Sequence, residues 1–261
     1  MSDATIWTRA YVTMNEYRVS WQSTQVMWSA ERELVPLQRM ESRIEKNLLG
    51  LMTQAVQVKG YVQGLAERAF MESIATQGYM WTQIHHANGA PGEGALILRG
   101  AFNKFSWKED HGGVEGFEND MNTNDGVQVM LGSIMWNTFL TAGAAPIAAA
   151  TTSTPVELPA LAAGFLGRFL IAFPDPDPIT GTTPTLDGTL ESDVDDTFAT
   201  PTTRGTLTQV AGAATYQAFE FDGDAAPITD TFWRWNISAI GGTATPSYHI
   251  IAAGAVNPRV S

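Results

Sequence analysis

From about residue 156 onward, apolar residues recur at every second position. This period of two constrains the fold more than any other feature of the sequence. Apolar and polar residues then alternate, as they do in β-strands that bury one face. Turns rich in Pro, Gly and Asp separate these segments, with no helical pattern between them. We expect an antiparallel β-sandwich of jelly-roll type over residues 156–261. Its six strands are predicted at Phe165–Phe173, Thr185–Glu191, Thr206–Val210, Thr215–Phe221, Phe232–Ile240 and Ser247–Val256.

Residues 1–77 carry a different pattern, which predicts long helices. No Pro or Gly occurs before Pro36, and large side chains recur every seven residues on both sides of it. On a helix such residues form one stripe. The stripe is either the packed face of a helical hairpin within one domain or a seam between subunits. In the second case the interface residues are Trp7, Met14, Trp21, Trp28, Leu37, Ile44, Leu51 and Val58.

The two patterns together predict an α+β fold, in which long N-terminal helices precede the C-terminal sandwich. Residues 78–140 read as a mixed α/β region, with a loop at Gly89–Gly94 and a short buried strand at Ala95–Leu98. Val127–Leu140 is apolar and fits either a helix or a pair of strands. Residues 141–155 are rich in Ala, Thr, Gly and Pro, and we expect a linker or an extended arm there.

Charge and composition exclude several classes of protein. The chain has 261 residues, 44% of them hydrophobic, which favours a folded chain over a disordered one. Its net charge of −12 argues against sequence-independent binding to nucleic acid. With no cysteine, it has no disulfide, thiolate zinc site or thiol nucleophile. The N-terminus lacks the apolar region of a secretory signal, and the longest apolar run, Leu158–Phe173, is interrupted by Pro159 and Arg168. We therefore expect synthesis in the cytoplasm and no membrane span.

Candidate chemistry is sparse. Three acidic clusters in predicted turns fit either solvated turns or a Ca²⁺ site, although none has the spacing of an EF-hand loop. No hydrolase, zinc-protease or phosphate-loop motif occurs, and none of the four histidines stands in a chelating pattern. We expect no catalytic residue, metal or other cofactor. The clusters are Asp175/Asp177, Glu191–Asp196 and Asp222–Asp224, and the histidines are His85, His86, His111 and His249.

Two tryptophans leave a second function open. Trp233 and Trp235 share one face of a predicted strand, because residues two apart in a strand point the same way. They fit either the core of the sandwich or a platform on which a sugar ring stacks. The platform would make the chain a carbohydrate-binding module.

A resemblance to a known family lies in residues 158–256. After the strand Phe165–Phe173 come Thr-Gly-Thr-Thr-Pro-Thr-Leu at 180–186, an acidic turn and Phe198. The segments Trp-Arg-Trp-Asn-Ile at 233–237 and Gly-Gly-Thr-Ala-Thr-Pro-Ser at 241–247 follow. This pattern resembles the small β-sandwich module of tailed-bacteriophage virion proteins. The Pro-Asp-Pro-Asp-Pro insertion at 174–178 and the N-terminal half depart from it.

The resemblance implies a non-enzymatic structural protein of a virion. Its most direct implication is a head decoration, or cement, protein that binds at junctions between capsid subunits and so stabilises the shell. A main shell or tail protein is the alternative position in the particle. The implied partners are further copies of the chain, with a trimer among the expected oligomers, and a major capsid protein.

Overall fold

In the computed structural model the chain is built from β-strands. Every regular element among the residues that the structure describes is a strand, so the expected α+β fold with long N-terminal helices is wrong. No described segment forms a helix with the length and hydrophobicity needed to cross a bilayer. The structure describes residues 5–7, 10–18, 23–37, 46–62, 79–86, 90–109, 115–122, 129–139, 145–174, 180–211 and 214–259.

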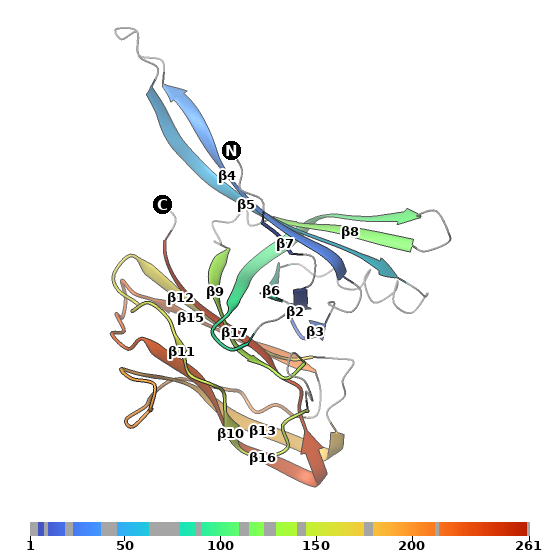
Figure 1. Cartoon of the computed structure of the whole chain (residues 1–261), viewed down its shortest axis with the longest axis vertical. Coiled ribbons are helices and arrows are strands. Elements are labelled where there is room, and N and C mark those ends of the chain that lie inside the picture. The colour runs from blue at the N-terminus through green and yellow to red at the C-terminus, as the bar shows by residue number, and fades with distance from the viewer. Residues whose placement is uncertain are drawn as a thin grey trace.

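The larger of two antiparallel sheets has 12 strands and contains the whole described N-terminal half (Figure 1). Its main path runs β1-β4-β5-β8-β7-β9-β17-β12-β15, while β6 joins β7 to β2, which pairs with β3. The strands are β1 (Thr5–Trp7), β2 (Ala10–Met14), β3 (Tyr17–Arg18), β4 (Ser23–Leu37), β5 (Lys46–Val62), β6 (Tyr79–His86), β7 (Gly94–Glu109), β8 (Glu115–Asn122), β9 (Met130–Asn137), β12 (Phe165–Phe173), β15 (Thr215–Asp222) and β17 (Ile251–Pro258).

The smaller sheet has five strands and belongs entirely to the C-terminal half. Its order is β10-β16-β13-β14, and β11 also pairs with β16. Residues 151–157, within the segment expected to be a linker or arm and just beyond it, thus supply the short strands that line one edge of β16. The strands are β10 (Thr151–Thr152), β11 (Val156–Glu157), β13 (Thr180–Asp193), β14 (Thr202–Thr206) and β16 (Phe232–Ser247).

A sandwich core lies between this small sheet and the β9-β17-β12-β15 end of the large one. The rings of Phe169 on β12 and Trp233 on β16 stack across it with centroids 4.3 Å apart. Trp235 and Tyr248 are also fully buried there. Burial of aromatic side chains of this size contributes much of the stability of such a core. The cluster includes Ile171, Phe173, Leu186, Leu190, Ile237, Ile250 and Val256.

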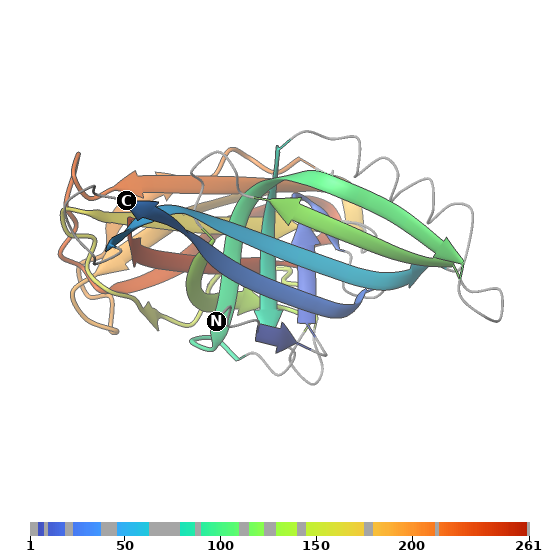
Figure 2. The ribbon, with the colours of Figure 1, turned by 90° about the horizontal axis from the view of Figure 1, so that it is seen from above.

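The strands β12 and β17 are buried on both faces. Trp81, Ile97 and Ile134 pack on the side of β12 and β17 that faces away from the sandwich core, against Leu170 and Ala253. Figure 2 shows the N-terminal strands, in blue and green, lying across the C-terminal ones. The strand predicted at Phe165–Phe173 is confirmed, because β12 has the same bounds. Every residue of β12 from Gly167 to Phe173 is buried.

Two N-terminal strands extend beyond the body of the large sheet. β4 and β5 pair with each other from Ser23 to Leu37, while β1 pairs with β4 only at 26–28 and β8 with β5 only at 55–62. Among the described residues, 29–37 and 46–54 thus form a two-stranded ribbon, which we call the β4–β5 ribbon. It is about 30 Å long at roughly 3.3 Å per residue and projects from the body (Figure 1).

The spacing of seven misled the helix prediction for a geometric reason. Positions seven apart lie on one side of a helix, but in a strand an odd separation places them on opposite faces. A stripe of residues seven apart therefore does not exist in β4 and β5. The backbone hydrogen bonds that a helix makes locally are made here between two strands joined through a long hairpin.

Candidate functional site

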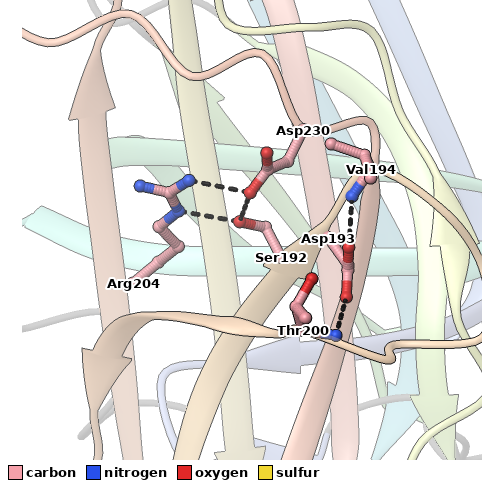
Figure 3. Close-up of polar contacts among 6 residues, drawn as sticks. All are labelled: Ser192, Asp193, Val194, Thr200, Arg204 and Asp230. Atoms are coloured by element: carbon pink, nitrogen blue, oxygen red, sulfur yellow. Dashed lines mark hydrogen bonds and ion pairs between the residues drawn. The ribbon is translucent and has the colours of Figure 1, made fainter.

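A group of hydrogen-bonded polar side chains lies at one end of the small sheet (Figure 3). Ser192 on β13 donates its hydroxyl proton to Asp230 Oδ2 at 2.6 Å. Arg204 on β14 donates from Nε to Ser192 Oγ and from Nη2 to Asp230 Oδ2, each at 2.7 Å. These contacts join β13, β14 and the segment that enters β16. We call them the Ser192 cluster.

The Ser192 cluster has the contacts of a structural cluster rather than of a nucleophile. Burial acts to raise the pKa of Asp230, but hydrogen bonds from Ser192 and Arg204 outweigh it and hold that pKa below its ordinary value. Asp230 is thus a carboxylate at neutral pH. The Ser192 hydroxyl is fully buried, accepts from a guanidinium and has no histidine among its partners. Activation of a serine needs a neighbouring base that can take its proton.

A second cluster sits on the outward face of the same sheet. Arg234 contacts Glu191 Oε2 through Nε at 2.9 Å and Nη2 at 2.8 Å, and Asn236 donates to Glu191 Oε1 at 2.7 Å. The ring of Phe198 lies 4.1 Å from the Arg234 guanidinium carbon. Phe198 has a positive φ of 50°, which turns its side chain back onto the sheet. Glu191 is therefore a buried, fully partnered carboxylate.

The acidic turn after β13 binds its own backbone. Asp193 accepts from the amides of Val194 at 2.7 Å and Thr200 at 3.0 Å, which closes the loop that carries Phe198. Asp195 accepts from the amide and hydroxyl of Thr197, and these hydrogen bonds lower its pKa. Both carboxylates thus cap their own turn instead of converging on a shared point with free oxygens, as a Ca²⁺ site requires.

The acidic turn after β15 is partnered by a cation from the chain itself. Arg259 forms ion pairs with Asp222 and Asp224, and its contact with Asp222 lowers the pKa of that carboxyl. Asp224 Oδ1 also accepts the Gly164 amide at 2.7 Å. Within the part of the chain that the structure describes, no group of three or more His, Asp or Glu side chains could hold a metal. Asp175 and Asp177 lie outside the described residues.

His85 belongs to a buried chain of hydrogen bonds that joins three strands. Its ring nitrogens contact Gln83 Oε1 at 3.1 Å and Asn137 Nδ2 at 3.0 Å, and Gln83 donates to the Ile251 carbonyl. The acceptor at Gln83 and the donor at Asn137 fix a neutral ring with its proton on Nε2. Burial lowers the pKa of His85 to about 3. His85 is therefore neutral at physiological pH and fully used in packing.

The remaining histidines do not form a chelating group in the described residues. The His249 ring stacks on Phe139 with centroids 4.4 Å apart, and its Nδ1 lies 3.2 Å from Thr138 Oγ1. His86 is placed at the end of β6, and His111 lies outside the described residues. The stack on Phe139 connects the end of β9 to the turn before β17.

The two tryptophans considered for sugar stacking are core residues. Trp233 and Trp235 are both 0% exposed. Trp233 stacks on Phe169, and the ring centroid of Trp235 lies 5.8 Å from that of Phe219. A stacking platform must present an aromatic face to solvent, so the interpretation of these residues as a platform is wrong.

The predicted interface residues are spread over strands instead of one helical stripe. Trp7 and Trp28 lie on the adjacent strands β1 and β4, with Trp7 opposite Val26 and Trp28 opposite Thr5. Met14 is fully buried in β2. Their role between subunits stays a prediction. Leu37, Leu51 and Val58 lie on β4 and β5, whereas Trp21 and Ile44 fall outside the described residues.

Sequence reasoning missed two backbone features. One is the pairing of β4 with β5, where Gly50 and Gly60 in the expected helix were a usable signal because glycine weakens helices. The other is β15, whose free edge no sequence pattern reveals. Among the described residues β15 pairs with β12 alone, over Thr215–Asp222 without a bulge.

Comparisons with known proteins give weak likenesses to virion proteins. No family model matches the chain, and no curated protein matches its sequence. The Dit protein of phage SPP1 is described as a paradigm of the hub adsorption apparatus in phages that infect Gram-positive bacteria. It is similar over 95% of this chain and 99% of its own, at 10% identity and a TM-score of 0.37.

A second solved structure is similar over a smaller part. A chain from the virion of a native gene transfer agent particle matches 46% of this chain and 95% of its own, at 12% identity and a TM-score of 0.35. Likenesses at this level do not assign roles to residues.

Proposed function

We propose that this chain is a non-enzymatic structural protein of a tailed-phage particle, where copies of it assemble into the tail or the main shell. The observation that carries this proposal is the β4–β5 ribbon. The sequence resemblance of residues 158–256 to virion β-sandwich modules gives the proposal its biological class.

The ribbon supports assembly because a two-stranded β-ribbon is marginally stable in water by itself. Over residues 29–37 and 46–54 each strand has one strand neighbour in the described part of the chain. The sequence at 48–52, Leu-Leu-Gly-Leu-Met, has the apolar composition of a strand that becomes covered. A neighbouring copy in a particle wall would provide that cover, and the energy of assembly would stabilise the ribbon.

The polar clusters support a role without catalysis. Three buried side chains are of types that often serve in catalysis, namely those of Ser192, Glu191 and His85. Each of them forms hydrogen bonds with residues of neighbouring segments. A carbohydrate-binding module loses its basis because Trp233 and Trp235 are core residues. A structural protein that works by binding neighbouring subunits fits these observations better than an enzyme or a carbohydrate-binding module does.

The position within the particle is part of the proposal. A long projecting ribbon suits a building block that reaches into its neighbours, and we therefore favour the tail or main shell over a decoration protein. Capsid decoration and a major capsid protein as partner rest on the sequence resemblance alone and stay predictions. The same applies to the trimer.

Purified particles test the proposal directly. Antibodies against the chain, labelled with gold and viewed by electron microscopy, should mark intact particles at the tail or over the shell. Densitometry of particle proteins then gives the copy number, which is low for a tail hub and high for a shell. If the chain is absent from particles whose other proteins are all accounted for, the proposal is wrong.

A shortened hairpin tests the role of the ribbon. Replacing residues 29–54 by a tight turn should leave a folded body, because the deleted stretch lies beyond the pairings of β4 with β1 and of β5 with β8. This variant should fail to enter particles or to form oligomers in light scattering. If the shortened chain assembles as well as the full one, the ribbon has no role in assembly.

A further inference from the structure

We propose that the open edge of β15 binds the same edge of a second copy, so that two large sheets continue into each other through an antiparallel β15–β15 pair. The proposal rests on the self-assembly part of the proposed function and names one of its contacts. Among the described residues β15 is the last strand of the large sheet, and no strand pairs with its outer side.

The edge lacks the features with which proteins usually block strand addition. Its sequence, Thr-Tyr-Gln-Ala-Phe-Glu-Phe-Asp, has no Pro, Gly or Lys, and its pairing with β12 runs over eight residues without a bulge. Free edges of this kind recruit further strands unless a bulge, a proline, a lysine or a covering segment prevents it. The other described sheet ends in β14, where a bulge in the pairing with β13 interrupts the ladder.

Several side chains of β15 are only partly buried, so a second molecule could bury them further. Tyr216, Phe219 and Phe221 pack against the two buried clusters and yet remain partly exposed. Gln217 fixes the strand to the neighbouring loop, since its amide exchanges hydrogen bonds with the backbone of Thr208 at 2.6 and 2.8 Å. The strand is therefore anchored through Gln217 and incompletely buried.

Charge points to a second copy as the occupant. A chain of net charge −12 repels itself unless the contact surface is locally neutral. The two acids of β15 meet this condition, because Glu220 pairs with Arg168 at 2.9 Å and Asp222 pairs with Arg259.

The geometry of a two-fold pair fits the same sequence. Antiparallel pairing of identical edges forms an isologous contact, the commonest kind between identical subunits. With the two-fold axis through Ala218, this residue faces its own copy, and Glu220 of one strand faces Tyr216 of the other. No acid then lies opposite an acid.

The absence of cysteine gives a direct test. Ala218→Cys places its thiol at the proposed axis, opposite the same thiol of the second copy, where directly paired strands bring Cα atoms within disulfide reach. Mild oxidation of the full chain should convert this variant to covalent dimers. Thr203→Cys is the matched control, because Thr203 lies exposed on β14, the edge of the other sheet, and should stay uncrosslinked.

Wild-type protein supplies a second readout that no substitution can disturb. Hydrogen exchange of the β15 amides should slow as protein concentration rises through the monomer–oligomer transition seen in light scattering. Crosslinking no faster than that of Thr203→Cys, or β15 exchange that is independent of concentration, would overturn the proposal. Particles that contain the chain without a β15 contact would refute this inference alone, whereas β15 dimers absent from particles would refute the virion proposal alone.

Discussion

Ser192 Oγ lies 2.6 Å from Asp230 Oδ2, and this contact ties the end of β13 to the segment that enters β16. Asp230→Ala removes the acceptor of both Ser192 and Arg204. We expect a loss of about 1–3 kcal/mol in the free energy of unfolding, because the buried Ser192 hydroxyl and the partly buried Arg204 guanidinium lose their acceptor. Urea denaturation measures this change. Asp196→Ala, at an exposed position of the neighbouring turn, should change stability by less than about 0.5 kcal/mol.

A different variant separates the contributions within that cluster. Ser192→Ala leaves the Arg204–Asp230 ion pair in place and should cost less than Asp230→Ala. If the two substitutions cost the same, the ion pair between Arg204 and Asp230 contributes nothing measurable.

His85 should make the protein sensitive to acid. Its pKa is about 3 in the fold and near 6.5 when unfolded, so between these values only the unfolded state binds the proton. The stability contributed by the neutral ring is complete above pH 6.5 and falls toward pH 3, by at most about 1.4 kcal/mol per pH unit. Urea denaturation at a series of pH values measures the slope.

His85→Gln keeps a donor and an acceptor and removes the titrating group. This variant should lose the His85 part of the slope, whereas His249→Gln, at the half-buried histidine of the Phe139 stack, should retain it. Equal slopes in wild type and His85→Gln would show that His85 does not carry the acid sensitivity.

The C-terminal strands could be predicted because the sequence of each strand shows the alternation and the flanking turn residues that are typical of a β-strand. Phe165–Phe173 and Thr215–Phe221 match β12 and β15 closely, since alternation and turn residues are local properties of the sequence. The burial of the Leu166–Leu170 face of β12 could not be predicted in the same way, because it has a non-local cause. The N-terminal strands cover that face, and only the fold brings Trp81 and Ile97 to Leu170.

The N-terminal half could not be predicted by the same means. Spacing of seven and the absence of early Pro or Gly suit a helix locally, while the partner of β4 is β5, on the far side of a long hairpin. The candidate sites depended on distant residues in the same way. Arg259, which neutralises Asp222 and Asp224, lies more than thirty residues away in sequence, and pairing at that distance leaves no local signal.

Close contact between β9 and β17 depends on Gly132. A Cβ on Gly132 would lie 2.2 Å from the Gly254 carbonyl oxygen and 2.5 Å from the Ala255 Cβ. Gly132→Ala should therefore force the strands apart and cost about 1–3 kcal/mol. Gly94→Ala, where the added methyl meets open space, should leave the melting temperature nearly unchanged. Equal melting temperatures for the two variants would show that the β9–β17 contact can relax freely.

Tyr248 carries a buried hydroxyl whose contribution to stability can be measured. Its ring is fully buried, and its hydroxyl has no hydrogen-bond partner among the described residues. Burial and the charge of Asp187 raise the pKa of Tyr248 to about 12, so the hydroxyl stays protonated at neutral pH. Tyr248→Phe should leave stability unchanged or raise it by about 1 kcal/mol. Trp233→Ala, by contrast, should cost about 3–5 kcal/mol, because it removes a ring from the same core. A clear loss in Tyr248→Phe would reveal a partner for the hydroxyl.

Calcium should have no effect on stability through the acidic turns. Arg259 already pairs with Asp222 and Asp224, and the carboxylates of Asp193 and Asp195 accept backbone amides of their own loop. A cation would have to displace these donors without gaining the six to eight oxygens it needs. Thermal melts in excess Ca²⁺ and in a chelator should therefore coincide. If Ca²⁺ raises the melting temperature, Arg259→Ala identifies the site: a larger rise in that variant places the ion between Asp222 and Asp224, and an unchanged rise places it elsewhere.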